Sequence, residues 1–343
     1  MTLDLQTLED TAHEMVTEGK GILAADESNA TMTKRLEAVG VESSDETRLR
    51  FRELLFTTPE AEEHISGVIL YDETIRQATS DGTPIPEFLA SRGMIPGIKV
   101  DTGAKPLAGA EDEKVTEGLD GLRERLAEYH ELGARFAKWR GVIAIGEDSP
   151  SRTCISANAH ALARYAALCQ EAGIVPIVEP EVLMDGDHSI DSSEVATRAT
   201  LHAVFGELLE QRVALEGIVL KPNMVLSGTD CSDQAGVDEV AERTLALLRQ
   251  VVPAAVPGIA FLSGGQSDEN ASAHLSALNA LGPAPWELSF SYGRALQAAP
   301  LGAWAGEDSN ADKTQAAFAH RARCNGEARF GRYTDELEQA LAA

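Results

Sequence analysis

The chain has few of the residues that build disulfide frameworks or metal centres. It contains four cysteines in 343 residues, and none of them has the CxxC spacing: Cys154, Cys169, Cys231 and Cys324. The eight histidines are scattered, without HxxxH or HxH spacing. We therefore expect free thiols in a reducing compartment, no metal site and no other cofactor.

The chain also lacks a long apolar run and a basic face. No run approaches the roughly 20 residues that cross a bilayer, and residues 1–18 are acidic and mixed, unlike a signal or transit peptide. The 29 Lys and Arg against 55 Asp and Glu give a formal net charge of -26, which argues against a nucleic-acid partner. We expect a cytoplasmic protein without membrane contacts. The acidic excess also supports a hypothesis of adaptation to high salt, which activity falling in molar KCl would contradict.

Lysine is rare, and its placement is therefore informative. Only eight lysines occur, and three of them, Lys99, Lys138 and Lys221, are predicted to end strands. A single strand-end lysine is most simply a structural ion pair. Three at corresponding positions indicate a site instead.

Apolar β-prone runs that end on polar or charged residues recur along the chain. Between them lie amphipathic, helix-like segments, including residues 119–129, 158–171, 193–210 and 237–251. The eight runs begin at Ile22, Val68, Ile95, Ala134, Ile174, Gly217, Ile259 and Leu288. This alternation predicts a parallel α/β sheet, and the count favours a closed (β/α)8 TIM barrel over an open doubly wound sheet. No linker divides the chain, so we expect one domain over residues 1–343, with an N-terminal extension of about 1–20 and a short C-terminal tail of about 325–343.

Lys221 closes the run Gly217–Leu220, and Pro222 prevents a helix from continuing there. Because residues two apart on a strand share a face, Lys138 pairs with Arg140 and Glu179 with Glu181. Neighbouring strands would place Lys138, Glu179 and Lys221 side by side. A second ammonium disfavours protonation of the first, and an unprotonated amine beside a carboxylate can form a Schiff base with a carbonyl. The alternative is a buried ion network without chemistry.

Two glycine-rich loops follow the last two predicted strands. Ser263-Gly264-Gly265 and Gly293-Arg294 offer backbone N–H groups and a guanidinium, and loops at this address often bind phosphate in TIM barrels. A second anion site is plausible near the first strand, at Ser28, Lys34 and Arg35, although Lys-Arg on a helix is often merely solvated. Asp26 is a candidate base at the same strand end, or else an N-cap.

The sequence closely resembles class I fructose-1,6-bisphosphate aldolase in its animal and plant form. The resemblance runs in order from about Gly19 to about Tyr333 and rests on seven strings: residues 21–28, 97–101, 136–140, 174–181, 220–225, 261–267 and 289–297. It implies that Lys221 forms the Schiff base, that Glu179 and Lys138 serve proton transfer, that Asp26 handles the C4 hydroxyl proton, and that Glu181 lies near the imine. The resemblance also implies two groups of phosphate and sugar ligands. These are Ser263, Gly264, Gly265, Gly293 and Arg294 for the C1 phosphate, and Ser28, Lys34, Arg35, Lys99 and Arg140 around the open-chain sugar and its C6 phosphate.

The resemblance further implies a metal-independent lyase acting on a sugar bisphosphate, and a homo-oligomer, most commonly a tetramer. The chain departs from the animal enzymes at its end, because it stops at residues 341–343 without their terminal tyrosine. Tyr333 matches an earlier tyrosine of that tail, and we predict no catalytic role for it. Two alternatives stay open: a related Schiff-base enzyme, such as a transaldolase or an aldolase of different stereochemistry, and a non-catalytic sugar-phosphate-binding or scaffold protein.

Overall fold

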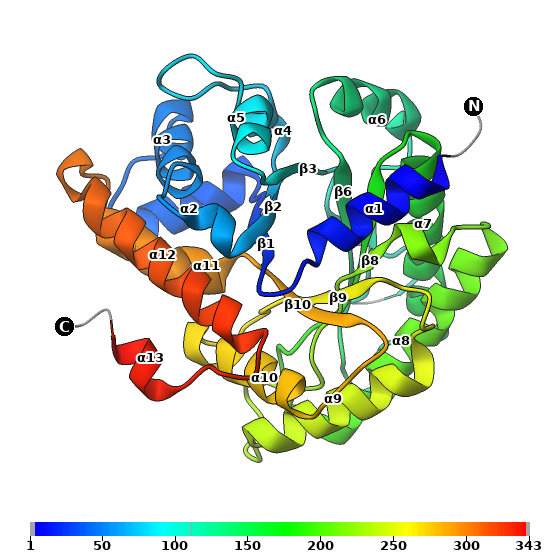
Figure 1. Ribbon diagram of the computed structural model, residues 1–343. Helices are drawn as coiled ribbons and strands as arrows, with labels where there is room; N and C mark the ends of the chain where they lie inside the picture. Colours follow the sequence, from blue (N-terminus) through cyan, green and yellow to red (C-terminus); the bar gives the residue numbers. More distant parts are fainter. Residues whose placement is uncertain (1–3, 111, 341–343) are drawn as a thin grey trace.

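A closed parallel barrel forms the centre of the protein (Figure 1). The computed structural model describes residues 4–110 and 112–340. Eight strands pair in the order β1-β2-β3-β6-β7-β8-β9-β10, and β10 pairs with β1 to close the ring. The barrel strands are β1 Gly21–Ala25, β2 Ile65–Leu70, β3 Ile95–Lys99, β6 Phe136–Ile143, β7 Val175–Val182, β8 Val219–Leu220, β9 Gly258–Phe261 and β10 Glu287–Tyr292. The predicted (β/α)8 TIM barrel is therefore confirmed.

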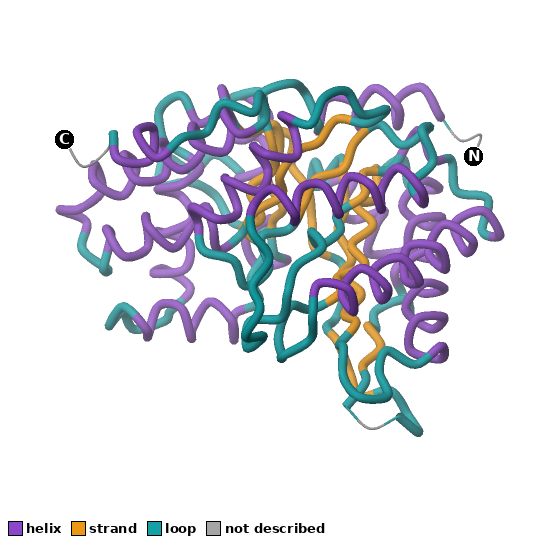
Figure 2. Tube along the Cα trace, turned by 90° about the horizontal axis from the view of Figure 1, so that it is seen from below, coloured by secondary structure: helices purple, strands orange, loops and turns teal. Residues whose placement is uncertain are grey.

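Helices surround the strands, which Figure 2 shows at the centre of the molecule. The α-helices are α1 Leu5–Met15, α2 Asn29–Ala38, α3 Asp45–Phe56, α4 Asp72–Ile75, α5 Ile85–Ser91, α6 Leu122–Glu131, α7 Arg152–Glu171, α8 Ile190–Glu210, α9 Val237–Val251, α10 Asp268–Ala280, α11 Arg294–Trp304, α12 Ala311–Ala328 and α13 Asp335–Gln339. In the described part of the chain, short 3-10 helices occur at Ala61–Glu63, Leu215–Gly217 and Asp308–Asn310, and the hairpin β4 Ala104–Pro106 with β5 Lys114–Thr116 lies between β3 and α6. No helix within residues 4–110 and 112–340 is long and apolar enough to cross a membrane.

The predicted helices are all present, and two of them begin earlier than their apolar pattern. α7 starts at Arg152 because Ser151 caps it, with the Ser151 Oγ accepting from the Cys154 N–H at 3.1 Å. α8 starts at Ile190 and is capped in the same way by Ser189. A serine N-cap accepts a hydrogen bond from a backbone N–H of the first turn, so a helix can begin before the first residue that it buries.

Four strands differ from their predicted bounds, and one of them, β2, begins at Ile65, three residues before its predicted start at Val68. β6 and β7 continue past the polar residues expected to end them and pair through Ile143 and Val182. The β4–β5 hairpin supports this extension, since Thr116 donates its hydroxyl to the Arg140 carbonyl at 2.7 Å. β8 is shorter than expected, because the 3-10 turn Leu215–Gly217 occupies the start of its predicted run.

The first described helix, α1, packs on β2 and β7 of the barrel, and the last one, α13, packs on α12. The predicted extension at 1–20 contains α1, which buries Leu8, Ala12 and Met15 against the apolar interior. The predicted tail at 325–343 begins inside α12, which ends only at Ala328, and continues into α13. Residues 341–343, where the aromatic terminus is absent from the sequence, lie outside the described residues.

Candidate active site

Lys221 lies at the carboxyl end of β8, within the mouth of the barrel. Its backbone N–H donates to the Val178 carbonyl at 2.8 Å, which continues the strand ladder by one residue. Its side chain is buried, and the Nζ atom lies 3.3 Å from Glu179 Oε1. The ammonium or amine is therefore held at one fixed position beside a carboxylate.

A chain of contacts continues from Glu179 across two more strands. Lys138 Nζ lies 3.5 Å from Glu179 Oε2 and 2.6 Å from Asp26 Oδ2. Each of these side chains is less than a tenth exposed. The predicted adjacency of Lys138, Glu179 and Lys221 is confirmed, and Asp26 joins it as an ion-pair partner.

The charges of these neighbouring side chains determine whether Asp26 and Lys138 are protonated. Burial opposes ionisation of Asp26, but the charges of Lys138 and Lys221 outweigh it and lower the pKa of Asp26 to about 2. Burial also opposes protonation of Lys138, while the charges of Asp26 and Glu179 raise its pKa above the ordinary range. At neutral pH, Asp26 is therefore a carboxylate and Lys138 an ammonium.

A second row of ion pairs lies beside this chain. Arg140 Nε contacts a carboxylate oxygen of Glu181, and Lys99 Nζ lies 2.9 Å from Asp101 Oδ1. Asp101 is a site residue that we did not predict, although it stands two residues after Lys99 and therefore follows the same strand-end pattern.

The glycine loops after β9 and β10 present backbone N–H groups that an anion could approach. Gly264 has a φ of 56°, a left-handed conformation that glycine adopts without strain. The Gly265 N–H points at Met184 Sδ at 3.1 Å, and a thioether is a weak acceptor that an anion can replace. Arg294 opens helix α11 directly after Gly293, and it is exposed. N–H groups at a helix start favour negative charge.

The predicted second anion site is only partly assembled. Ser28 caps α2 by accepting from the Thr31 N–H at 3.3 Å, so the N-cap alternative for Asp26 is wrong. Arg35 Nη1 lies 2.5 Å from Glu27 Oε1 and faces the barrel mouth. Lys34 is exposed on α2 and is not among the described residues that line the mouth. Consecutive helix residues point about 100° apart, and of these two it is Arg35 that lines the mouth.

These groups line one cavity of about 990 Å³ at the carboxyl end of the barrel. Every predicted site residue except Lys34 lines it. Sequence reasoning also missed the support of Glu27, whose side chain accepts from Gln297 at 2.7 Å, while its backbone carbonyl accepts from the fully buried Arg52 at 2.8 Å. Arg52 and Gln297 lie within helices, where no strand-end pattern could reveal them.

Tyr333 lies away from this cavity. Its hydroxyl donates to Glu338 Oε2 at 2.7 Å, and its backbone N–H donates to Ser276 on α10 at 3.2 Å. Tyr333 therefore makes its contacts on the outside of the barrel, whereas Lys221, Glu179, Lys138 and Asp26 lie within its mouth.

Comparison with known proteins agrees with the fold. The family model for class I fructose-bisphosphate aldolase matches residues 7–343. A probable fructose-bisphosphate aldolase class 1 of Xanthomonas campestris pv. campestris is 58% identical over 96% of this chain and 99% of its own, and fructose-bisphosphate aldolase 1 of Toxoplasma gondii is 49% identical over 98% and 93%. The solved aldolase of Plasmodium falciparum, in complex with TRAP and an inhibitor, superposes with a TM-score of 0.95 at 47% identity over 96% of both chains. The chain belongs to the class I fructose-bisphosphate aldolase family.

Proposed function

We propose that this protein reversibly cleaves fructose 1,6-bisphosphate to dihydroxyacetone phosphate and glyceraldehyde 3-phosphate through a Schiff base on Lys221. The observation that carries the proposal is the contact chain Lys221–Glu179–Lys138–Asp26 in the barrel mouth. It supplies a nucleophilic amine, a proton-transfer carboxylate and an ionised base.

Imine formation uses the Lys221–Glu179 pair. The unprotonated Lys221 amine attacks the C2 ketone, and the resulting carbinolamine loses its hydroxyl as water. Glu179, 3.3 Å from the amine, gives and takes the protons of this step. Lys138 balances the charge of Glu179 from the other side and orients it.

Cleavage uses Asp26, at the other end of the series of contacts that begins with Lys221. The Asp26 carboxylate takes the proton of the C4 hydroxyl, and the C3–C4 electron pair flows to the iminium nitrogen. Glyceraldehyde 3-phosphate leaves, and protonation of the enamine at C3, followed by hydrolysis, returns dihydroxyacetone phosphate and the free amine. The low pKa of Asp26 keeps it ionised in the free enzyme, ready to accept this proton.

The two phosphates would bind on opposite sides of the mouth. Ser263, Gly264, Gly265, Gly293 and Arg294 line the side that we assign to the C1 phosphate. Ser28, Arg35, Lys99 and Arg140 line the rest and would hold the sugar hydroxyls and the C6 phosphate. Lys34 would contribute at most a long-range charge.

Borohydride trapping tests the proposal. The enzyme is incubated with dihydroxyacetone phosphate and borohydride in the presence of EDTA, and intact mass and peptide mapping follow. A single reduced adduct on Lys221 is the expected result. Binding of the substrate without an adduct would leave a non-catalytic sugar-phosphate-binding protein instead.

Two further measurements concern the stereochemistry of the product and the oligomeric state. Coupling the two triose phosphates and determining the configuration at C4 separates this activity from an aldolase of different stereochemistry. We further propose a cytosolic homotetramer. Light scattering coupled to size-exclusion chromatography reports the mass of the assembly.

A further inference from the structure

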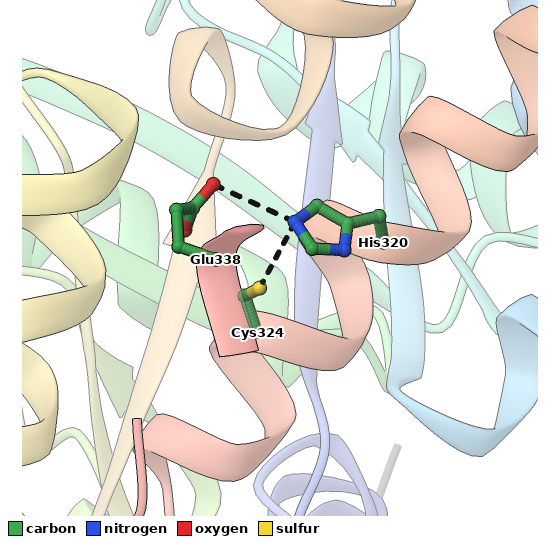
Figure 3. A group of neighbouring side chains, drawn as sticks. All are labelled: His320, Cys324 and Glu338. Carbon is green, nitrogen blue, oxygen red and sulfur yellow. Dashed lines mark hydrogen bonds and ion pairs between the residues drawn. The ribbon is translucent and has the colours of Figure 1, made fainter. Parts of the chain in front are cut away.

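Three side chains of mixed chemistry meet on the outside of the barrel, where α13 packs on α12 (Figure 3). His320 and Cys324 stand one turn apart on α12, and Glu338 approaches from α13. Figure 3 shows the sulfur and the carboxylate both directed at the same ring nitrogen of His320. The spacing His-x-x-x-Cys differs from the CxxC, HxxxH and HxH spacings of common metal sites.

The distances match those of a tetrahedral metal centre. His320 Nε2 lies 3.5 Å from Cys324 Sγ and 3.5 Å from Glu338 Oε1, and all three ligand atoms lie within 4.8 Å of one another. Around Zn²⁺, with metal–sulfur bonds of about 2.3 Å and metal–nitrogen and metal–oxygen bonds of about 2.0 Å, tetrahedral ligands stand about 3.3 to 3.6 Å apart. Two of the three separations therefore already have the required length.

Burial and outer contacts hold the three groups in place. Cys324 is fully buried, the His320 side chain is 10% exposed, and the Glu338 side chain is 22% exposed, which leaves an approach from solvent. Tyr333 donates to Glu338 Oε2, and Arg321 Nη1 contacts both oxygens of the Glu338 carboxylate. A carboxylate accepts about four hydrogen bonds, so these three contacts orient the group and leave one lone pair for a metal.

Zinc binds cysteine as the thiolate, so a bound divalent cation would displace the thiol proton of Cys324.

We propose that His320, Cys324 and Glu338 form a Zn²⁺ site, with one position left for water, that fastens the C-terminal helix α13 to α12. The site is separate from the barrel mouth, so it takes no part in the cleavage reaction. Its effect is to fix residues 335–339 against the barrel. EDTA should therefore release the tail and leave imine formation on Lys221 unchanged.

Zinc titration of the full-length protein tests this site. Protein stripped with EDTA and freed of it by gel filtration is titrated with Zn²⁺ against a chromophoric chelator. The wild type should bind one equivalent per chain, and Cys324→Ser and His320→Gln should each weaken binding by at least about 100-fold, because loss of an outer-shell partner alone costs 10- to 100-fold. Cys231→Ser is the matched control, since Cys231 lies in a loop away from the cluster, and it should bind like the wild type.

Two further readouts locate the metal. Co²⁺ in place of Zn²⁺ should give a thiolate charge-transfer band in the near ultraviolet that Cys324→Ser lacks. Zn²⁺ should slow tryptic cleavage after the exposed Arg332 in the wild type and not in Cys324→Ser. Borohydride trapping on Lys221 shows that each variant is folded. Equal Zn²⁺ affinity of the wild type and Cys324→Ser, or no stoichiometric binding, would overturn the proposal without affecting the proposed aldolase activity.

Discussion

The two halves of the barrel interior are built from the same strands but have opposite chemistry. Four inward-facing pairs of residues two apart change from apolar to charged: Ala24 and Asp26, Phe136 and Lys138, Ile177 and Glu179, and Val219 and Lys221. We call the apolar residues Ala24, Phe136, Ile177 and Val219 the lower layer, or plug, and the charged residues Asp26, Lys138, Glu179 and Lys221 the upper layer. Because alternate strand residues share a face, a step of two residues along a strand leads from the lower layer to the upper layer. The plug and the catalytic cluster are adjacent layers of one structure.

The comparison shows which layer holds the fold and which does the chemistry. Phe136 fills the lower half so closely that a Cβ at Gly97 would lie 2.2 Å from its ring, and one at Gly67 would lie 2.9 Å away. The upper half keeps charged groups buried, which costs desolvation free energy that their mutual pairing offsets. Variants in the upper layer should therefore change turnover most, and variants in the lower layer should change stability most.

Lys221→Met should have the largest effect, on the upper layer alone. Without the amine there is no imine, so kcat should fall by about 10⁴-fold or more. Steady-state turnover and borohydride trapping measure the loss. Lys313→Met, at an exposed lysine on α12, is the control and should retain full activity. Residual imine chemistry at another lysine would contradict the assignment.

Asp26→Asn should separate the two steps within the upper layer. The amide cannot take the C4 hydroxyl proton, so cleavage should fall by about 10²- to 10⁴-fold. Imine formation with dihydroxyacetone phosphate needs Lys221 and Glu179, so trapping should persist. Single-turnover kinetics with both substrates make the comparison, and an equal loss of trapping and cleavage would place Asp26 in imine formation.

Phe136→Ala should act on the lower layer. Emptying the plug should cost about 3 to 5 kcal/mol of unfolding free energy, measured by denaturant titration. Gly97→Ala should also destabilise the protein, by about 1 to 3 kcal/mol, through overpacking against the same ring. The double variant should be less unstable than the sum of the two changes, because removing the ring removes the clash. Strict additivity would show that the ring and Gly97 do not interact.

Most strands and helices of the barrel can be predicted from the sequence, because each depends on the pattern of apolar residues within its own segment. Apolar runs and helix-like segments predict the barrel strands, β1 to β3 and β6 to β10, and the helices α6 to α9 in order. The extension of β6 beyond Lys138 does not follow, because it depends on the β4–β5 hairpin, which contacts it from outside the local pattern. The shortening of β8 depends on a 3-10 turn in an equally apolar stretch.

The sequence predicts which candidate site residues lie together where strand geometry alone determines it. Lys221, Glu179, Lys138 and Arg140 lie on neighbouring strands, and parallel pairing places them together. Arg35 lines the cavity and Lys34 does not, because the phase of a helix, unlike the order of strands, cannot be read from two adjacent cationic residues. The role of Lys34 as a ligand stays a prediction. Arg52, Gln297 and the His320 cluster depend on helix packing across long sequence separations, which no single motif records.

Acid should weaken the upper layer selectively. The pKa of Asp26 is about 2 in the fold and near 3.9 in an unfolded chain, so its ionisation contributes about 2 to 3 kcal/mol of stability above pH 4, which is lost as the pH falls toward 2. Protonated Asp26 resembles an asparagine. The unfolding free energies of the wild type and Asp26→Asn should therefore differ most near neutral pH and approach each other between about pH 4 and pH 2. Denaturant titrations at several pH values compare them, and a constant difference would mean that the charge of Asp26 does not stabilise the catalytic layer.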